Sequence, residues 1–190
     1  MITGSGFNQD ISLSIIKQAQ AGDMNAIECI YRTYCEPCHF LAFRICRDKA
    51  LSEDIVHDAF MNIIQQISGL KDRAVIGGWI KRIVTNVAIN KLRKYSRIES
   101  LPSKDEEMLI SNNLFEHQWL DICDDLEKLM TNLSVTTRAV LILHEIEGYT
   151  HQEIAEIFDK TESFSKAALS RAYTKLKQLA LAQGVNYASK

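Results

Sequence analysis

The stretch Trp79-Ile80-Lys81-Arg82-Ile83-Val84-Thr85-Asn86-Val87-Ala88 decides how the rest of the chain is interpreted. Its apolar residues recur every three or four positions, the spacing of one face of an α-helix. This apolar stripe consists of Trp79, Ile80, Ile83, Val84, Val87, Ala88 and Leu92. The opposite edge carries amide and guanidinium groups at Arg82, Asn86, Asn90 and Arg93. We therefore predict a helix that buries one side and presents a row of polar side chains on the other.

Helical spacing continues on the N-terminal side of this stretch. Residues 1–13 are expected to be a flexible start, and Ala21-Gly22-Asp23 is expected to separate the first two helices, because glycine and a capping aspartate favour a break. We predict another helix through Cys38 and Ile45, with Pro37 either near its first turn or as a kink, and a further helix opened by Ser52. The apolar positions that support these helices are Ile15, Ile16, Ala19, Ala26, Ile27, Ile30, Tyr31, Tyr34, Cys38, Leu41, Ala42, Ile45, Ile55, Ala59, Phe60, Ile63, Ile64 and Ile67.

The chain changes character on the C-terminal side. Residues 98–118 are polar and acidic and include Pro102, which is typical of an inter-domain linker. Helical spacing resumes at Trp119, and Ser134 is expected to cap a helix that stops at Gly148. The whole chain has 2 prolines and 8 glycines in 190 residues and little strand-like alternation. We therefore predict an all-α protein of two small helical domains joined by a flexible acidic linker.

Charge is strongly segregated along the chain, although the formal net charge is only −2. Residues 71–98 sum to +7, residues 99–127 to −8 and residues 160–178 to +4. Two basic blocks separated by an acidic connector suit a protein that contacts polyanions at two places. The same blocks also suit ordinary solvated helix faces, so charge alone leaves both interpretations open.

Residues 150–178 form the second informative pattern. Thr150-His151-Gln152-Glu153 fits a capping box, and about two helical turns follow before the polar turn Asp159-Lys160-Thr161. A longer basic helix comes next. This order is typical of a helix-turn-helix, whose second helix fills the major groove of DNA. A helical hairpin used only for packing has the same geometry, but the basic outer face of the second helix favours DNA binding.

These motifs resemble two regions of a known protein family. Residues 146–156, with their Glu-Gly turn, threonine cap and Glu-Ile-Ala-Glu run, resemble region 4 of bacterial sigma factors. Ser52–Phe60 and Trp79–Ala88 resemble region 2. With both halves in this order, the chain is identified as a member of the extracytoplasmic-function (ECF) group of the sigma-70 family. The family usually has Gly where Asp159 stands.

The resemblance implies a transcription initiation factor rather than an enzyme. Such a protein binds core RNA polymerase and directs it to promoters by recognising the −10 and −35 elements. The implied partners are the β and β′ subunits of the bacterial core enzyme, promoter DNA and an inhibitory anti-sigma factor, with no cofactor or metal. The implied domains are region 2 at 14–97, the linker at 98–118, region 4 at 119–182 and a tail at 183–190.

The resemblance also assigns candidate site residues. The acidic start of the helix opened by Ser52 is expected to dock on the polymerase, through Glu53, Asp54, Asp58 and Phe60. Asparagine amides that pair with base edges, and basic groups that hold phosphates, are expected at the opened −10 strand. These −10 residues are Lys81, Arg82, Asn86, Asn90, Arg93 and Lys94. The expected −35 contacts are Ser165, Lys166, Ser170, Arg171 and Lys175.

Two other interpretations have support in the residues. A stand-alone helix-turn-helix regulator explains residues 119–180 but leaves residues 79–97 without a role. Cys35-Glu36-Pro37-Cys38-His39 matches the haem-attachment pattern C-x-x-C-H, which would suit a redox or haem protein. Haem attachment of that kind needs export, and we see no signal peptide and no apolar run long enough to span a bilayer. We therefore expect a cytoplasmic protein whose five cysteines are thiols.

Overall fold

The computed structural model describes residues 6–72, 75–99 and 129–182. The chain separates into two compact units, residues 1–101 and 102–190. The described residues are mainly helical and include no strand, which confirms the predicted all-α class. Most of the predicted linker, residues 98–118, and the predicted tail, residues 183–190, lie outside the described residues.

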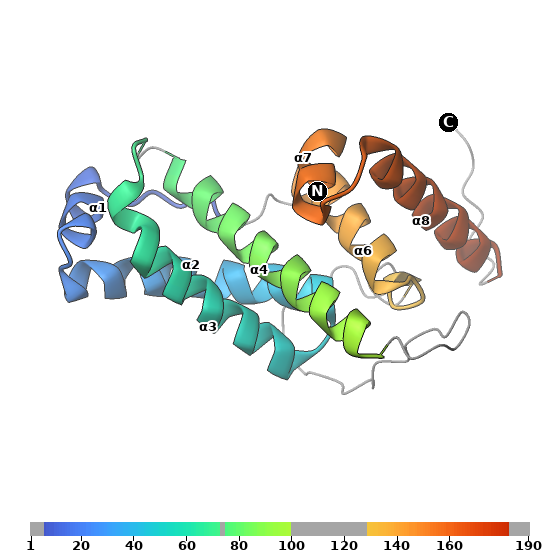
Figure 1. Ribbon diagram of the computed structural model, residues 1–190, viewed down its shortest axis with the longest axis horizontal. Coiled ribbons are helices and arrows are strands. Elements are labelled where there is room, and N and C mark those ends of the chain that lie inside the picture. Colours follow the sequence, from blue (N-terminus) through green and yellow to red (C-terminus); the bar gives the residue numbers. More distant parts are fainter. Residues whose placement is uncertain (1–5, 73–74, 100–128, 183–190) are drawn as a thin grey trace. The chain divides into compact units, whose positions relative to one another are not determined.

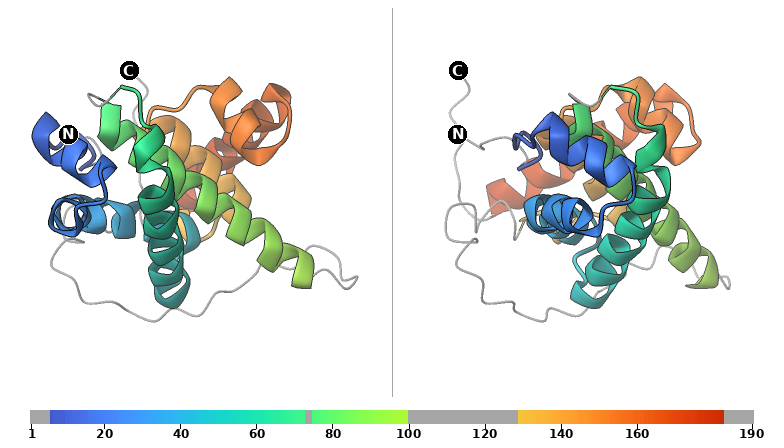
Figure 2. Two further views of the ribbon diagram at one scale, coloured as in Figure 1. Left: turned by 60° about the vertical axis from the view of Figure 1, so that its left-hand side comes forward. Right: turned by 90° about the vertical axis from the view of Figure 1, so that its left-hand side faces the viewer.

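The N-terminal unit contains α1 (Leu13–Gln20), α2 (Met24–Cys46), α3 (Lys49–Gln66), the short 3-10 turn η1 (Ile67–Gly69) and α4 (Ile76–Glu99). Helices α2, α3 and α4 pack pairwise against one another, and α1 lies on α2 (Figures 1 and 2). The apolar stripes predicted from the sequence meet in this core. Its largest fully buried side chains are Ile16, Ile30, Tyr34, Leu41, Ile45, Ile55, Ile63, Ile80 and Ile89.

The break between α1 and α2 is confirmed. Gly22 has φ +89°, which glycine adopts without steric strain. The Asp23 carboxylate then accepts the backbone N–H groups of Asn25 and Ala26 and caps α2.

The predicted start of α3 at Ser52 is wrong. Helix α3 begins at Lys49, because the Asp48 carboxylate accepts the Leu51 backbone N–H at 2.8 Å. Ser52 is buried inside the helix, and its hydroxyl donates to the Lys49 carbonyl at 2.7 Å. Asp48 and Ser52 are both good capping residues, and the apolar spacing does not distinguish between them.

Helix α2 runs through Pro37 as one helix of 23 residues, so this proline lies inside a helix and not at the first turn of a new one. Proline lacks the backbone N–H and removes one hydrogen bond of the helix interior. Its ring and the side chains of Cys38 and Leu41 that follow are buried in the unit. Tertiary packing of this face therefore offsets the lost backbone hydrogen bond.

The segment before α1 contacts α2 through Phe7 and Gln9. The Phe7 ring is buried and stacks on the Tyr34 ring of α2, with centroids 6.3 Å apart. The Tyr34 hydroxyl donates to the Gln9 carbonyl at 2.9 Å. The expectation of a flexible start at residues 1–13 missed this anchor at Phe7, because a single aromatic residue outside any repeat leaves no periodic signal.

The C-terminal unit contains α6 (Val135–Leu141), the π-helical turn η3 (Ile142–Ile146), α7 (His151–Phe158) and α8 (Glu162–Ala182). Helices α6 and α7 both pack against α8. The predicted cap is confirmed, since the Ser134 hydroxyl accepts the Thr137 backbone N–H. The predicted stop is also confirmed, because Gly148 has φ +74° after η3.

The N-terminal segment leads to a test at the start of α4. A Cβ on Gly77 would overlap the Phe7 carbonyl oxygen and lie 3.3 Å from the Tyr34 hydroxyl. We expect Gly77→Ala to lower the unfolding free energy of this unit by about 1–3 kcal/mol, because the backbone at Phe7 must move to make room for the new methyl group. The measurement is urea unfolding followed by Trp79 fluorescence, in a background carrying Trp119→Phe so that one tryptophan remains.

Gly78→Ala is the matched control, because a Cβ at Gly78 meets no atom within 4 Å. This change should leave stability unchanged or raise it by up to about 1 kcal/mol, as alanine favours the helix. Equal effects of the two substitutions would contradict the packing of Phe7 against Gly77.

Candidate binding surfaces

Helix α4 presents the predicted row of polar residues. Ile80, Val84 and Ala88 are fully buried against α2 and α3. On the other side, Arg82 and Asn90 are exposed, whereas Asn86 is half-buried. Of the remaining predicted −10 residues, Lys94 is exposed and Lys81 and Arg93 are half-buried. The edge of α4 therefore presents amides and basic groups together on a helix whose sequence has no acidic residue before Glu99.

This chemistry suits nucleic acid. Guanidinium and ammonium groups hold phosphates, and an asparagine amide pairs with base edges when these are accessible. The row lies on a long, well-anchored helix, so its side chains start from fixed positions. A surface of this kind fits a backbone-plus-base contact rather than a small-molecule site.

Helix α3 carries the predicted acidic surface, with one correction. Glu53 and Asp54 are exposed and Asp58 is half-exposed. Phe60 is buried, with only 6% of its surface exposed, and packs edge-on against Tyr31 of α2 at 4.7 Å between centroids. The prediction of Phe60 as an apolar anchor for a partner is therefore wrong for this conformation.

Two other apolar residues of α3 are exposed in its place. Met61 is 47% exposed and Ile64 is 41% exposed. Helical spacing puts Met61, three residues after Asp58 and seven after Asp54, on the same side of α3 as these carboxylates, whereas Ile64 lies further around the helix toward its C-terminal end. Sequence reasoning missed them because Ile64 fitted the predicted buried stripe, whereas Met61 belonged neither to that stripe nor to the predicted acidic surface.

The carboxylates of α3 are linked to α4. The Lys91 ammonium contacts the carboxylates of both Asp54 and Asp58, at 2.7 Å for Asp58. Burial alone would lower the pKa of Lys91, but hydrogen bonds and attraction from the two carboxylates outweigh it and raise that pKa. The lysine is therefore charged at neutral pH and ties the acidic helix to the basic one.

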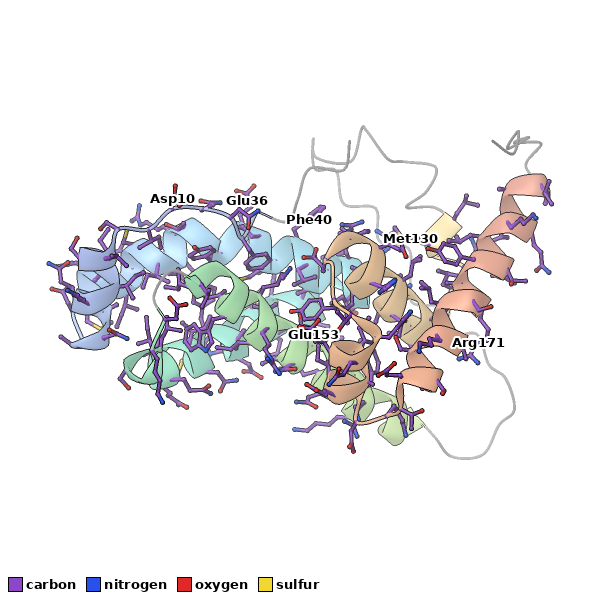
Figure 3. All side chains as sticks on the ribbon, turned by 90° about the horizontal axis from the view of Figure 1, so that it is seen from above. Asp10, Glu36, Phe40, Met130, Glu153 and Arg171 are labelled. Carbon is purple, nitrogen blue, oxygen red and sulfur yellow. The ribbon has the colours of Figure 1, made fainter. Side chains whose placement is uncertain are left out.

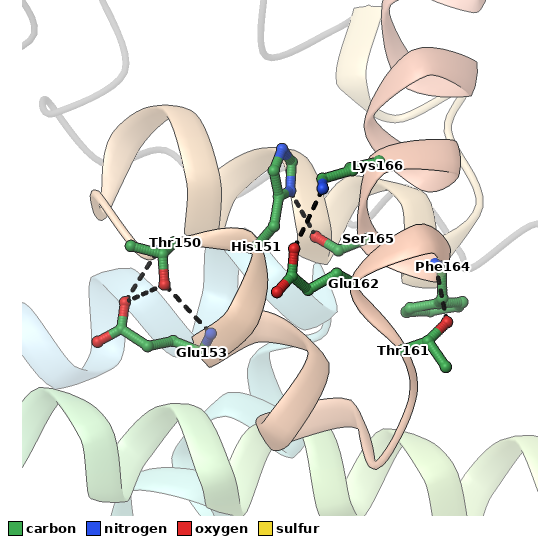
Figure 4. Close-up of polar contacts among 8 residues, drawn as sticks. All are labelled: Thr150, His151, Glu153, Thr161, Glu162, Phe164, Ser165 and Lys166. Carbon is green, nitrogen blue, oxygen red and sulfur yellow. Dashed lines mark hydrogen bonds and ion pairs between the residues drawn. The ribbon is translucent and has the colours of Figure 1, made fainter.

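The C-terminal unit has the expected helix-turn-helix. The Thr150 hydroxyl accepts the Glu153 backbone N–H at 3.2 Å, and the Glu153 carboxylate accepts the Thr150 backbone N–H at 2.8 Å (Figure 4). This reciprocal pair confirms the predicted capping box. Asp159 then ends α7 in a left-handed conformation, with φ +53°. The usual family glycine fits this position, and aspartate tolerates it better than most residues.

Helix α8 exposes four of the five predicted −35 contacts at least in part. Lys166, Ser170 and Arg171 are exposed and Lys175 is half-buried; Figure 3 labels Arg171 on this helix. Ser165 is fully buried, and its hydroxyl lies 3.0 Å from Nδ1 of His151 (Figure 4). The prediction of Ser165 as a DNA contact is therefore corrected, because this side chain joins α8 to α7 and faces away from solvent.

A contact between two histidines on either side of Gly148 was missed by sequence reasoning. The rings of His144 and His151 stack with centroids 4.3 Å apart and an angle of 13° between their planes. Burial lowers the pKa of His151, and the nearby charges of His144 and Lys166 lower it further. The two residues belong to different helical segments separated by Gly148, so no helical period could have paired them.

The cysteine motif of α2 shows the features of helix packing. Cys29, Cys35, Cys38 and Cys46 are free thiols, and Cys38 and Cys46 are buried. Burial raises the pKa of Cys38 far above its ordinary value and lowers that of His39. Among the described residues, no three His, Cys, Asp or Glu side chains converge in a way that would hold a metal ion. Cys123 lies outside those residues.

We find no described helix with both the length and the apolar content needed to cross a bilayer.

Comparison with protein families gives two matches in the expected order. Residues 30–98 match the family described as Sigma-70 region 2, and residues 123–176 match Sigma-70, region 4. Among curated proteins, the chain is 23% identical over 168 residues to ECF RNA polymerase sigma factor SigM of Mycobacterium tuberculosis, covering 87% of this chain and 84% of that protein. It is 26% identical over 162 residues to ECF RNA polymerase sigma factor SigM of Bacillus subtilis, covering 84% and 98%.

Two solved structures share the fold. One is the sigma factor RpoE in complex with the anti-sigma factor NepR from Bartonella quintana, with a TM-score of 0.56, 22% identity, and coverage of 80% of this chain and 94% of that one. The other is CnrH in complex with the cytosolic domain of CnrY, with a TM-score of 0.53, 18% identity, and coverage of 89% and 96%.

The left-handed turn at Asp159 provides a test of the helix-turn-helix geometry. We expect Asp159→Ala to lower the unfolding free energy of the C-terminal unit by about 1 kcal/mol, because a Cβ without a local hydrogen-bonding group is strained at this φ. Asp159→Gly should be at least as stable as the wild type. Thermal unfolding followed by circular dichroism measures both variants.

Lys160→Ala, one residue further on and without a positive φ, is the control and should change little. If Asp159→Ala were as stable as Asp159→Gly, the left-handed turn between α7 and α8 would be disproved.

Proposed function

The chain belongs to the sigma-70 family, in its ECF group, and we propose that it is the promoter-recognition subunit that binds core RNA polymerase and directs it to −10 and −35 elements. The observation that carries this function is the presence of both family regions on one chain, region 2 at residues 30–98 and region 4 at residues 123–176. A stand-alone helix-turn-helix regulator is not favoured, because it leaves the region 2 match without a role. The family consists of transcription factors rather than enzymes, and we propose no catalytic role for this chain.

We propose that polymerase docking uses the outer side of α3. The surface combines the carboxylates of Asp54 and Asp58 with the exposed apolar side chain of Met61, and exposed Ile64 extends it toward the C-terminal end of α3. An apolar centre with charged groups beside it is the usual composition of a protein interface whose affinity is concentrated in a few residues. Glu53 is exposed at the rim and pairs weakly with Lys49, at 3.7 Å within the same helix.

We propose that the polar row of α4 captures the opened −10 strand. Asn86 and Asn90 would read base edges, and the basic residues Lys81, Arg82, Arg93 and Lys94 would hold phosphates. The opposite side of α4 supports this role, because the buried side chains of Ile80, Val84 and Ala88 hold the row in a fixed orientation. Base reading by this row requires a strand that is already unpaired, since base edges of a closed duplex are confined to its grooves.

We propose that α8 enters the major groove at the −35 element. Lys166, Ser170 and Arg171 are among the exposed residues of its N-terminal half, and half-buried Lys175 follows one turn later. Lys166 also pairs with Glu162 at 3.1 Å, so an acceptor and a donor stand together at the start of the helix (Figure 4). Recognition helices commonly read bases with these first turns.

Regulation and location are inferred from the same assignment. The two structural neighbours are complexes of a sigma factor with an anti-sigma factor and of CnrH with the cytosolic domain of CnrY. We propose that an anti-sigma factor also restrains this chain. We further propose a cytoplasmic location, because polymerase and promoter DNA are there.

Docking is tested by Asp58→Lys. Reversal of this charge should weaken binding to purified bacterial core RNA polymerase about tenfold or more, because a basic partner would meet a like charge. Fluorescence anisotropy of the labelled chain gives the affinity. Glu36→Lys makes the same change of charge at an exposed site on α2 and should bind as the wild type does (Figure 3). Wild-type affinity of a folded Asp58→Lys variant would remove α3 as the docking helix.

Strand capture is tested by Asn86→Ala. The loss of one base contact should cost about 1–3 kcal/mol in open-complex stability and relax base preference at one −10 position. Permanganate footprinting and run-off transcription measure this, while binding of the holoenzyme to a −35 duplex should be unchanged. Asn25→Ala, an exposed amide on α2, is the control. Normal opening with unchanged base preference in Asn86→Ala would rule out this role for α4.

A further inference from the structure

The Lys91 side chain occupies a particular place in the proposed docking surface. Its ammonium lies between the carboxylates of Asp54 and Asp58, one helical turn apart on α3. The lysine side chain is only 17% exposed, whereas the carboxylate side chains are 54% and 47% exposed. The cation therefore approaches from the protein side, and the two anions face outward.

This arrangement differs from the ion pairs formed within single helices. Arg32 with Glu28 and Lys49 with Glu53 are neighbours one turn apart, with every side chain at least half exposed. Such pairs contribute little to stability. Lys91, in contrast, joins two helices from a half-buried position and satisfies two acceptors at once.

The electrostatic consequence concerns any partner of α3. Two carboxylates one turn apart repel each other, and a nearby cation relieves this repulsion. With Lys91 in place, the three groups together carry one negative charge rather than two. A basic side chain of a partner must therefore compete with Lys91 for the carboxylate oxygens or share them with it.

We propose that Lys91 is an internal competitor that sets the affinity of the polymerase for the α3 docking surface. The inference rests on the proposed docking role of Asp54 and Asp58. In the free protein, the Lys91 ammonium occupies the position that a basic residue of the polymerase would take. It thereby reduces the binding of other cations to the two carboxylates, and it weakens their attraction for the polymerase. Removal of its charge therefore strengthens docking, although Lys91 itself need not contact the polymerase.

The test is Lys91→Met, which preserves length and removes the charge. One additional unit of net negative charge, about 7 Å from a partner cation in water-like surroundings, predicts at least about threefold tighter binding to purified core RNA polymerase at low ionic strength. The gain should come from faster association and shrink as salt is added. Lys17→Met removes the same charge from an exposed site on α1 and should change affinity much less.

A double-mutant cycle isolates the interaction. In a chain carrying Asp54→Asn and Asp58→Asn, the additional Lys91→Met change should give a clearly smaller gain, because only the general loss of one positive charge remains and no carboxylates are left to release. If Lys91→Met proves unfolded by circular dichroism, Lys91→Gln takes its place, because its amide donates to the carboxylates without a charge.

Three outcomes decide the proposal. Tighter binding whose gain shrinks in the double-asparagine background supports it. Unchanged or weaker binding by a folded Lys91 variant, or an equal gain without the carboxylates, overturns it while leaving the docking function intact. Failure of the wild-type chain to bind core polymerase would overturn the proposed function, and this inference with it.

Discussion

The burial of one side of α4 is the constraint on which the N-terminal unit depends. Ile80, Val84 and Ala88 are completely buried, and burial of a side chain the size of Ile80 or Val84 contributes about 1.5–3 kcal/mol relative to an exposed position. A rotation of α4 by one residue would bring Arg82 toward the core and some of these groups toward water. The orientation of the polar row is therefore a consequence of the apolar stripe, and the proposed strand capture depends on hydrophobic packing as much as on the asparagines.

The same packing explains how the proposed polymerase docking and strand capture can both be placed on the helices of the N-terminal unit. Helix α3 contributes its inner side to the core shared with α4, its outer side is the proposed docking surface, and Lys91 links the two helices. In the C-terminal unit, the orientation of the helix-turn-helix depends on local backbone geometry. Its capping box starts α7, and the left-handed Asp159 sets the angle at which α8 leaves the turn. Docking, strand capture and duplex reading thus rest on different physical devices within one chain.

Much of this organisation follows from periodicity. The stripe of α4, the break at Gly22 and the capping box at Thr150 were all predicted, because each is a local pattern with a direct physical cause. Errors arose where a tertiary contact decided the outcome. Phe60 matched a partner-binding motif but fills the space beside Tyr31, and Ser165 looked outward on a basic helix but bonds to His151.

Other features have no local signature at all. The packing of Phe7 on Tyr34 and the contact of Lys91 with Asp58 join residues 27 and 33 positions apart, respectively. No helical period connects them, so only the fold reveals them.

The central claim is that one chain combines two promoter contacts on the polymerase. The most direct measurement is run-off transcription of fragmented genomic DNA from the source bacterium by purified core polymerase, with and without the chain, followed by sequencing of RNA 5′ ends. We predict new start sites that share two upstream motifs at a constant separation, one for each unit. No new start sites, or start sites with a single shared motif, would contradict the account.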